Sequence, residues 1–316
     1  MSSEFDLIHK YFTYPTRHTN LGIGDDAALI SVANGMELVI STDMSVVGTH
    51  FFADAKPYNI GWKSLAVNIS DMAAMGAQAK WATLALALPE VNEPWLSEFS
   101  EGFFACANAF GIDLIGGDTT RGPLTISVQI MGEVPTGAAL KRSGAQADED
   151  IWISGNLGSA AVGLAHLQGK LTLKNELDIC LEVLNTPTPR AALGLALMGI
   201  AASCIDVSDG LLADLGHVLK ASNLGAMINL EKIPCIDFLK NDLQNPQFQA
   251  FILAGGDDYE LCFTAPVKER EAINKLSTQL NLPITLIGNT LIDVGLQAYY
   301  KNNEITLLKQ GFDHFG

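Results

Sequence analysis

Short apolar runs that stop at polar, acid-bearing segments make up the first half of the chain. Residues 37–40 (ELVI) are β-prone and lead into an acidic triplet at 41–43, and residues 81–88 have buried-strand character before a proline. From 124 to 131 apolar and polar residues alternate, the period of a strand with one covered face. Residues 59–75 and 95–110 have helical patterns instead. This mixture of strands and helices predicts an α/β (α+β) fold class.

A polar segment rich in small residues, 136–150, interrupts this pattern, and Ile151, Trp152 and Ile153 then begin a new strand. The length of 316 residues exceeds the usual size of one compact core. We therefore predict two domains, an N-terminal one at 1–138 and a C-terminal α/β one at 139–316.

Composition and net charge indicate what kind of protein this is and which partners it is expected to avoid. Hydrophobic residues make up 48% of the chain and charged residues 17%, which fits a folded protein. The net charge of -16 disfavours nucleic acid and anionic membranes as partners. The five cysteines are scattered and form no C-x-x-C pair, which suits a reducing compartment. The N-terminus is acidic, and no apolar run is long enough to span a bilayer. We therefore predict a cytoplasmic protein.

Four acidic turns in the first half share one construction, a carboxylate beside small or glycine residues. They lie at 22–26 (GIGDD), 41–43 (STD), 70–71 (SD) and 116–118 (GGD). One such turn is most often structural, because Asp and Gly are common turn residues. The presence of four such turns favours a second interpretation over the structural one. In this interpretation, carboxylates from several loops hold magnesium ions, and the ions hold phosphates.

The second half contains a similar segment, 205–210 (IDVSDG), before a helical apolar stripe. Ser208 is predicted to cap that helix, and Asp209 to complement the positive end of its dipole. A helix N-terminus near a metal-binding Asp206 is also a ready place for a phosphate. The capping and the ligand-binding interpretations are compatible.

Two further segments carry unusual side chains for their position. The segment 255–260 (GGDDYE) places three acids and a tyrosine before an apolar strand at 261–263, more acids than a hairpin turn explains. Near the C-terminus the segment 311–315 (GFDHF) contains two aromatic residues. The residues alone favour a core-covering role for these rings over stacking on a cationic ring.

The usual nucleotide-binding motifs are missing from the sequence. There is no G-x-x-x-x-G-K-[ST] segment, no G-x-G-x-x-G fingerprint and no G-x-S-x-G elbow. His50 is of interest because it follows the Asp43 segment. The pattern therefore predicts a magnesium-dependent phosphotransferase that holds its nucleotide through clustered aspartates rather than through a P-loop.

Eight motifs, in order and nearly end to end, resemble the thiamine-monophosphate kinase family. They are GIGDDAA, STDMSVVGTHF, AVNISDMAAMGA, LIGGDTTRG, KRSGA, IDVSDGL, GGDDYEL and GFDHF. This family is related to aminoimidazole ribonucleotide synthetase. The resemblance implies that the N-terminal domain, 1–138, binds metal and ATP and forms the homodimer, in which two such domains pair into a β-barrel. It implies that the C-terminal α/β domain, 139–316, adds nucleotide and substrate contacts. It also implies magnesium-dependent transfer of phosphate from ATP to thiamine monophosphate, giving thiamine diphosphate.

The resemblance also implies roles for single residues. The magnesium ligands would be Asp26, Ser41, Thr42, Asp43, Asp71, Asp118, Asp206 and Asp209. ATP would contact Gly117, Asp118, Arg142 and Ser208, and the catalytic set would be Asp71, Asp118 and Arg142. Thiamine monophosphate would face His50, Glu260 and Phe312, which moves Phe312 from the core to a stacking role. Asp25 and Asp257 are expected to be scaffolding, and Asp258 stays unassigned.

Two alternatives remain at this stage. One is another ATP-using enzyme of the same superfamily, although the first cysteine is Cys106 and the chain does not end in a cysteine, as relatives with reactive thiols would require. The other is a non-enzymatic module that binds metal or thiamine phosphate. Arg142 and Ser208 beside the acids favour nucleotide handling. In the kinase interpretation the transfer is in-line and forms no phosphoenzyme.

Overall fold

The computed structural model describes residues 4–306 and 311–312. Contacts divide the chain into two compact units, one of Met1–Met72 with Ala77–Gly137 and the other of Ala73–Gly76 with Ala138–Gly316. We call them unit 1 and unit 2 and describe each by itself. The predicted division of roles between 1–138 and 139–316 stays a prediction.

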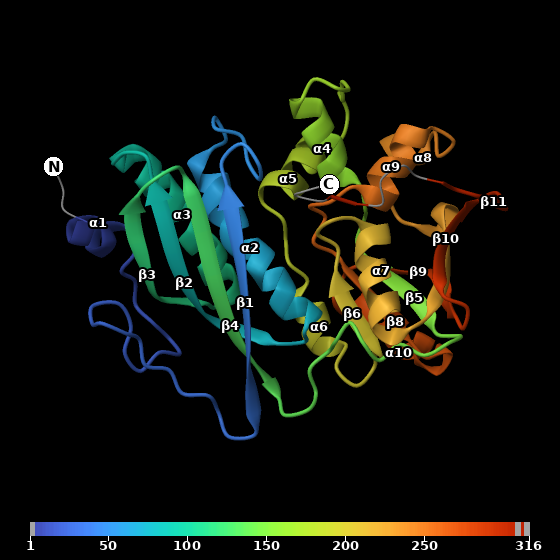
Figure 1. Cartoon of the computed structure of the whole chain (residues 1–316), viewed down its shortest axis with the longest axis horizontal. Helices are drawn as coiled ribbons and strands as arrows, with labels where there is room; N and C mark the ends of the chain where they lie inside the picture. The colour runs from blue at the N-terminus through green and yellow to red at the C-terminus, as the bar shows by residue number, and fades with distance from the viewer. Residues whose placement is uncertain (1–3, 307–310, 313–316) are drawn as a thin grey trace. The chain divides into compact units, whose positions relative to one another are not determined.

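Unit 1 is built on a four-stranded sheet (Figure 1). Its strands, in spatial order, are β1 (Met36–Val46), β4 (Thr125–Pro135), β2 (Gln78–Leu88) and β3 (Asp113–Arg121). Strand β4 is antiparallel to both of its neighbours, and β2 and β3 are parallel. The helices are α1 (Glu4–Tyr11), α2 (Pro57–Ala74) and α3 (Glu93–Phe110). Helices α2 and α3 cover one face of the sheet (Figure 1).

Local sequence explains these elements. In β4 the side chains of Ile126, Val128 and Ile130 are buried while the intervening polar residues are not, so the predicted alternation is confirmed. Helix α3 begins where the Asn92 side chain accepts a hydrogen bond from the Trp95 amide, and it ends at a left-handed glycine. The predicted helix at 95–110 is therefore confirmed, with its start two residues earlier.

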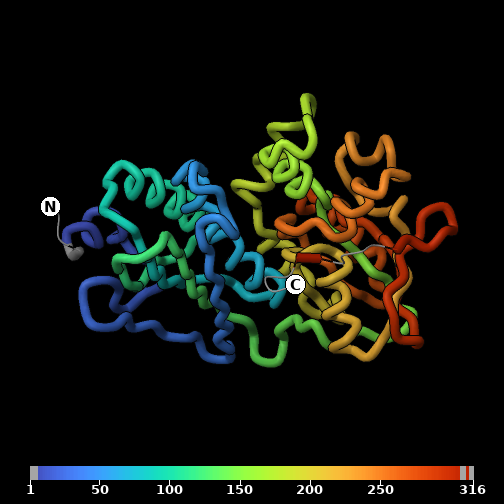
Figure 2. The backbone as a smooth tube through the Cα atoms, turned by 45° about the horizontal axis from the view of Figure 1, so that its top comes forward, coloured from blue at the N-terminus to red at the C-terminus, as the bar shows by residue number. Residues whose placement is uncertain are grey.

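A long loop between α1 and β1 covers part of the other face of this sheet (Figure 2). Ala28 and Ile30 pack against buried Trp81 and Met131. The loop is also fixed at both ends, because Asp113 accepts backbone amides of residues 17 and 18 and Glu133 accepts the amide of residue 33. Residues 24–26 lie between these anchors and are exposed.

Unit 2 contains a seven-stranded mixed sheet with helices on both faces. The strands in spatial order are β11 (Asn303–Glu304), β10 (Gly295–Tyr300), β7 (Gly225–Asn229), β9 (Ile284–Leu291), β5 (Asp150–Ser154), β8 (Leu261–Ala265) and β6 (Ser203–Asp206). The helices are α4 (Ser159–Leu167), α5 (Leu177–Asn185), α6 (Ala191–Ala196), α7 (Leu211–Ser222), α8 (Asp237–Lys240), α9 (Pro246–Ala254) and α10 (Arg270–Gln279), with short 3₁₀ turns η1 (Leu230–Lys232) and η2 (Val267–Glu269).

Successive side chains of the central strands of unit 2 point to opposite faces of the sheet, so the hydrophobic core is divided between these two faces. Ile151 and Ile153 of β5 join the cluster that packs under α4, α7 and α9. Trp152, between them, joins the opposite cluster with residues of α6 and α10. A strand that is apolar on both faces reads as a continuous run, which is why 151–153 was recognisable as a strand.

The α/β class is confirmed, but three of the four predicted acidic turns are wrong. Residues 41–43 lie inside β1, Asp71 lies inside α2, and residues 116–118 lie inside β3; only residues 22–26 lie in a loop. Pairing with β4 carries β1 past its apolar start to Val46, because a sheet partner outweighs the local preference of Asp and Thr.

Among the described residues no helix is both long and apolar enough to cross a membrane. Neither sheet closes on itself within the part of the chain that the structure covers. The predicted barrel between two subunits therefore stays a prediction.

Candidate functional site

Two carboxylates, Asp43 on β1 and Asp71 on α2, meet on the helix-covered face of the unit 1 sheet. The Ser41 hydroxyl donates to Asp71 Oδ2 at 2.5 Å, and the Asp43 amide donates to Asn68 Oδ1 at 3.2 Å. Asn68 is fully buried, and its Nδ2 donates to the carbonyl of Ser64 one turn earlier in α2. Asn68 therefore fixes the position of β1 against the helix turn that carries Asp71.

The electrostatics of this pair favour an added cation. Burial, together with the neighbouring charge of Asp71, raises the pKa of Asp43 to about 6. Two adjacent carboxylates and a serine hydroxyl are hard oxygen donors of the kind that Mg²⁺ prefers. The residues present therefore fit a divalent cation. No three His, Cys, Asp or Glu side chains group closely enough to hold a metal in the described ranges, so further ligands would be other oxygens.

The remaining predicted ligands of unit 1 lie elsewhere on the sheet. Strand register places Thr42 and Asp118 on the outer face, opposite to Asp43. Asp118 is on β3, three strand spacings or about 14 Å from β1. Asp26 lies exposed in the loop, where its amide donates to the Asp25 carboxylate. The predicted set is therefore spread over two faces and does not form one cluster.

Gly117 has a structural reason to be glycine. Its φ is +154°, and a Cβ at this position would lie 1.8 Å from the carbonyl oxygen of Leu84 on β2. Only glycine permits this approach between the two strands. The nucleotide contact predicted for Gly117 is not needed to explain the residue.

His50 lies exposed just after β1. Its Nδ1 accepts a hydrogen bond from the Val46 amide at 3.0 Å, which closes the turn that follows the strand.

In unit 2, the loop 207–210 connects β6 to α7 and carries Ser208 and Asp209, both half-buried. Asp206, at the end of β6, is buried. The amides of residues 208, 209 and 210 all donate to Asp214 Oδ2, at 3.0, 3.0 and 3.1 Å. Burial and the charge of Asp209 raise the pKa of Asp214 to about 6, against the lowering effect of the three amide bonds.

This geometry corrects the prediction for Ser208. The residue in the N-cap position of α7 is Gly210, which has no side chain to cap the helix. Asp214, in the first turn of α7, does the capping instead. Because these amides are already bound to a carboxylate, they are not available to a phosphate at this helix N-terminus.

The acid-rich loop before β8 packs against the loop 207–210. The Asp257 amide donates to the Ser208 carbonyl and the Tyr259 amide donates to the Val207 carbonyl, both at 2.9 Å. Asp257 and Tyr259 have positive φ, and the Tyr259 hydroxyl donates to Asp257 Oδ1 at 2.9 Å. Asp257 thus has the scaffolding contact expected of it.

Asp258, which the sequence left unassigned, points inward. It is buried, and its Oδ2 accepts the Gly158 amide at the start of α4 at 2.9 Å. Burial raises its pKa well above the ordinary value. We conclude that Asp258 caps α4 from a distant part of the chain.

Glu260 is buried in a polar cluster that the sequence did not reveal. Arg190 donates to both of its carboxylate oxygens, from Nε at 2.7 Å and from Nη2 at 2.5 Å, and the Ser154 hydroxyl donates at 2.6 Å. Burial alone would lower the pKa of Arg190, but its bonds to Glu260 raise it above the ordinary value. A Cβ at Gly155 would collide with the Glu260 carboxylate.

The last two predicted contacts are exposed. The Phe312 ring is 54% exposed, so the core role that the residues alone favoured is wrong, and its amide donates to the Asp209 carbonyl at 3.1 Å. The other aromatic of that segment lies outside the described residues. Arg142 is exposed, and its carbonyl accepts from the Ser222 hydroxyl.

The residues that sequence reasoning missed are Asn68, Ser154, Arg190 and Asp214. Asp214 carried one readable signal, an acid in the first turn of a predicted helix. Arg190 and Glu260 are seventy positions apart and gave none.

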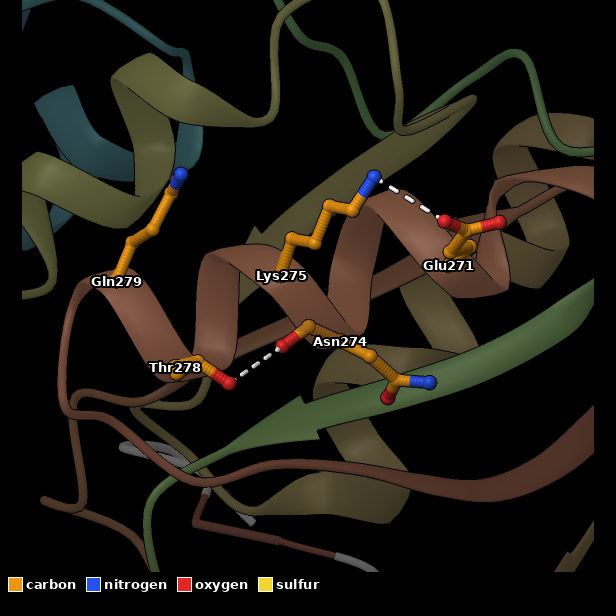
Figure 3. A pocket seen from close by; sticks show the side chains of 5 residues that line it. All are labelled: Glu271, Asn274, Lys275, Thr278 and Gln279. Atoms are coloured by element: carbon orange, nitrogen blue, oxygen red, sulfur yellow. Dashed lines mark hydrogen bonds and ion pairs between the residues drawn. The ribbon is translucent and has the colours of Figure 1, made fainter.

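A hollow on the surface of unit 2 is unrelated to this chemistry. It is lined by Glu271, Asn274, Lys275, Thr278 and Gln279 of α10 alone (Figure 3). Lys275 pairs with Glu271 across one helix turn at 3.1 Å, and none of the predicted site residues is among its lining side chains.

Comparison with known proteins first identifies the class of protein to which this fold belongs. Residues 24–134 match the family described as AIR synthase related protein, N-terminal domain. The fold also resembles a hydrogenase maturation protein HypE solved in complex with ATP, with a TM-score of 0.79 at 19% identity. The chain therefore has the fold of the proteins related to AIR synthase.

More similar proteins narrow the family. A thiamine-monophosphate kinase of Salmonella typhimurium is 45% identical over 319 residues, covering 99% of this chain and 98% of the relative, and one of Bacillus subtilis is 34% identical with 99% of both covered. The solved thiamine-monophosphate kinase of Stenotrophomonas maltophilia has a TM-score of 0.84 at 46% identity, covering 89% of this chain and 91% of that one. The chain belongs to the thiamine-monophosphate kinase family. AaThiL, complexed with AMPPCP and TMP, has a TM-score of 0.79 at 28% identity and covers 99% of this chain and 97% of its own.

Proposed function

We propose that the protein transfers the γ-phosphate of ATP to thiamine monophosphate, giving thiamine diphosphate and ADP. Membership of the family supports the activity, and a relative that binds AMPPCP, an analogue of ATP, together with TMP supports the two substrates. The observation in this chain that carries the proposal is the Asp43 and Asp71 pair, a concentration of negative charge that suits a metal-bound polyphosphate.

The residues that would hold magnesium are divided among several places. Ser41, Asp43 and Asp71 form one group on the inner face of the sheet. Thr42 and Asp118 lie on the outer face, Asp26 lies in the loop, and Asp206 and Asp209 belong to unit 2. This spread supports more than one ion. Bound magnesium would supply neutralisation of the phosphate charge.

The nucleotide would contact Gly117, Asp118, Arg142 and Ser208. Arg142 offers an exposed guanidinium to a phosphate, and Ser208 offers its side chain, because its backbone groups already bond within the protein. We assign Asp71, Asp118 and Arg142 to catalysis, the acids by holding cations and the arginine by direct contact with the transferred group.

No general base is required for this transfer. A phosphate monoester has a second pKa of about 6, so thiamine monophosphate is largely dianionic at neutral pH. One of its oxygens attacks the γ-phosphorus, the bond from that phosphorus to the β-phosphate oxygen breaks, and ADP leaves in line. The work of the protein is alignment, which supports a transfer without a phosphoenzyme.

Thiamine monophosphate would face His50, Glu260 and Phe312. The exposed ring of Phe312 is suited to stacking on the cationic thiazolium or on the pyrimidine. Glu260 is held in one orientation by Arg190 and Ser154, so any contact it makes with substrate would be pre-oriented.

We further propose a homodimer formed through the outer face and edge of the unit 1 sheet. The eleven-residue strand β1 is an edge strand, and Ile40 and Met44 on its outer face are 54% and 57% exposed. Long edges with exposed apolar residues favour pairing with another sheet. All five cysteines are free, which supports the proposal of a reducing cytoplasmic location.

The deciding experiment measures magnesium-dependent ADP formation with thiamine monophosphate, free thiamine and an aminoimidazole ribonucleotide precursor as separate acceptors. We expect ADP and thiamine diphosphate in equal amounts with thiamine monophosphate alone. Turnover with a different acceptor would favour another enzyme of the superfamily. Binding of thiamine monophosphate without any ADP would favour a binding module.

A further inference from the structure

The loop 207–210 has no spare backbone polar group. The Val207 amide donates to the Glu260 carbonyl and the Val207 carbonyl accepts from Tyr259. The carbonyls of residues 208, 209 and 210 accept the amides of Asp257, Phe312 and Asp214. The three remaining amides, of residues 208 to 210, donate to Asp214 Oδ2. The backbone of this loop is therefore bonded within the protein, so a ligand would be contacted through the side chains of Ser208 and Asp209.

Asp214 is the one partner in this set that a single substitution can remove. It is 3% exposed, and one oxygen receives three successive amides. Successive amides that converge on one point form the kind of concavity that binds anions, such as phosphate, in many nucleotide sites. In this chain its own carboxylate takes the place that a phosphate oxygen would take.

We infer that Asp214 is a positioning residue for the nucleotide and metal site. It closes the start of α7 to phosphate and holds the loop so that Ser208 and Asp209 present their side chains. The inference rests on the proposed function, because it takes Ser208 as a nucleotide contact and Asp209 as a metal ligand.

Two substitutions separate this role from simple support of the fold. Asp214→Ala leaves three amides without an acceptor and frees the loop, and misplacement of a ligand by about 1 Å costs roughly 10²-fold in turnover. Asp214→Asn keeps an oxygen that can accept the same amides. We therefore expect kcat/KM for MgATP to fall by about 10²-fold in the first variant and to be largely retained in the second.

Glu149 supplies a matched control. It is also a buried acid of unit 2, and it accepts the Gln146 amide and the Thr264 hydroxyl, neither of which belongs to a predicted ligand contact. Glu149→Ala should lower stability while leaving kcat/KM of the folded protein unchanged.

The experiment combines kinetics with amide hydrogen exchange on the full-length chain. ATP and thiamine monophosphate are varied separately, urea unfolding reports stability, and exchange is followed at residues 208–210. We expect these amides to be protected in the wild type and in Asp214→Asn but to exchange rapidly in Asp214→Ala. We also expect the loss of kcat/KM for MgATP to exceed that of Glu149→Ala.

The inference is overturned if Asp214→Ala loses no more kcat/KM than Glu149→Ala, or if Asp214→Asn is as impaired as Asp214→Ala. Failure of the proposed function looks different, because the wild type itself would form no ADP with thiamine monophosphate. In that case affinity for MgATP replaces kcat/KM, measured calorimetrically on the same variants. Equal affinity in all of them would reject the positioning role.

Discussion

The acids of unit 1 and unit 2 have different neighbours. In unit 1, Asp43 and Asp71 lie side by side, and the pKa of Asp43 is raised to about 6 by burial and by this like charge. In unit 2, Glu260 lies against the Arg190 guanidinium, which donates to both of its carboxylate oxygens. An acid that the protein itself neutralises serves the architecture, whereas an acid placed beside another acid creates a demand for a cation.

The largest effect expected from this difference is on Asp71→Asn. The substitution removes a charge from the pair but keeps an oxygen for the Ser41 hydroxyl. We expect turnover to fall by about 10²- to 10³-fold, the usual cost of losing one electrostatic stabiliser in a site. In the presence of a metal chelator we expect no loss of stability, because the repulsion on Asp43 is relieved.

ADP formation at limiting magnesium and urea unfolding in chelator check the two parts of this prediction. Asp25→Asn is the control, since Asp25 is an exposed loop acid expected to be scaffolding, and it should keep near-normal turnover. Near-normal turnover of Asp71→Asn would remove Asp71 from the catalytic set and would erase the contrast between the two units.

The opposite result, a loss of stability, is expected in unit 2 for the substitution Arg190→Met. Removing the guanidinium leaves Glu260 buried without its cation, which costs about 3 kcal/mol of unfolding free energy. Because Glu260 also loses its orientation, KM for thiamine monophosphate should rise more than KM for ATP.

Arg270→Met tests whether burial is the cause. Arg270 also binds a carboxylate with two nitrogens, on Asp150, but its side chain is 49% exposed. We expect a smaller loss of stability and no change in either KM, because exposed ion pairs contribute little. Equal losses in the two variants, measured by urea unfolding, would mean that the Arg190 pair is an ordinary surface contact.

Much of the fold could be predicted because its signals are local. The alternation of β4 and the asparagine and glycine at the two ends of α3 are readable within a few residues. The acidic turns could not be placed correctly, because β1 continues through Ser41 to Asp43 only by pairing with β4, some ninety positions later. Register and pairing are decided by the whole sheet.

The candidate site divides in the same way. Acidic and glycine-bearing motifs indicated Asp43, Asp71 and Asp209 as residues of interest. No sequence spacing indicates which residues hold these side chains in place. Asn68 is recognisable as a support only once β1 lies against α2. Arg190 is recognisable only once Glu260 lies beside it. Supports of this kind arise from tertiary packing between distant segments, so a single sequence carries little signal for them.

The smallest expected effect concerns an acid of unit 1 that the protein itself neutralises. It tests whether the behaviour of an acid depends on its neighbours and not on the unit in which it lies. Unit 1 contains its own neutralised acid, Glu133, which is buried and accepts from Lys80 Nζ at 2.5 Å and from the Ala33 amide. Burial would raise the pKa of Glu133, but these bonds lower it below its ordinary value of 4.5. Lys80→Met should therefore cost about 2 kcal/mol at neutral pH, the penalty of a buried group that keeps only part of its bonding.

The pH dependence of that loss follows from the sign of the shift. A carboxyl whose pKa is lowered on folding adds stability above its unfolded pKa and loses it as the pH falls through the folded value. The difference between wild type and Lys80→Met should therefore shrink below pH 4.5 in urea unfolding series. Lys10→Met is the matched control, because Lys10 and Glu93 are bonded at 2.6 Å but are 59% and 41% exposed, and it should show no measurable difference at any pH. A Lys80→Met difference that is constant with pH would mean that Glu133 is not held ionised by its neighbour, and Glu133 would then not serve as the neutralised acid of unit 1 in the comparison.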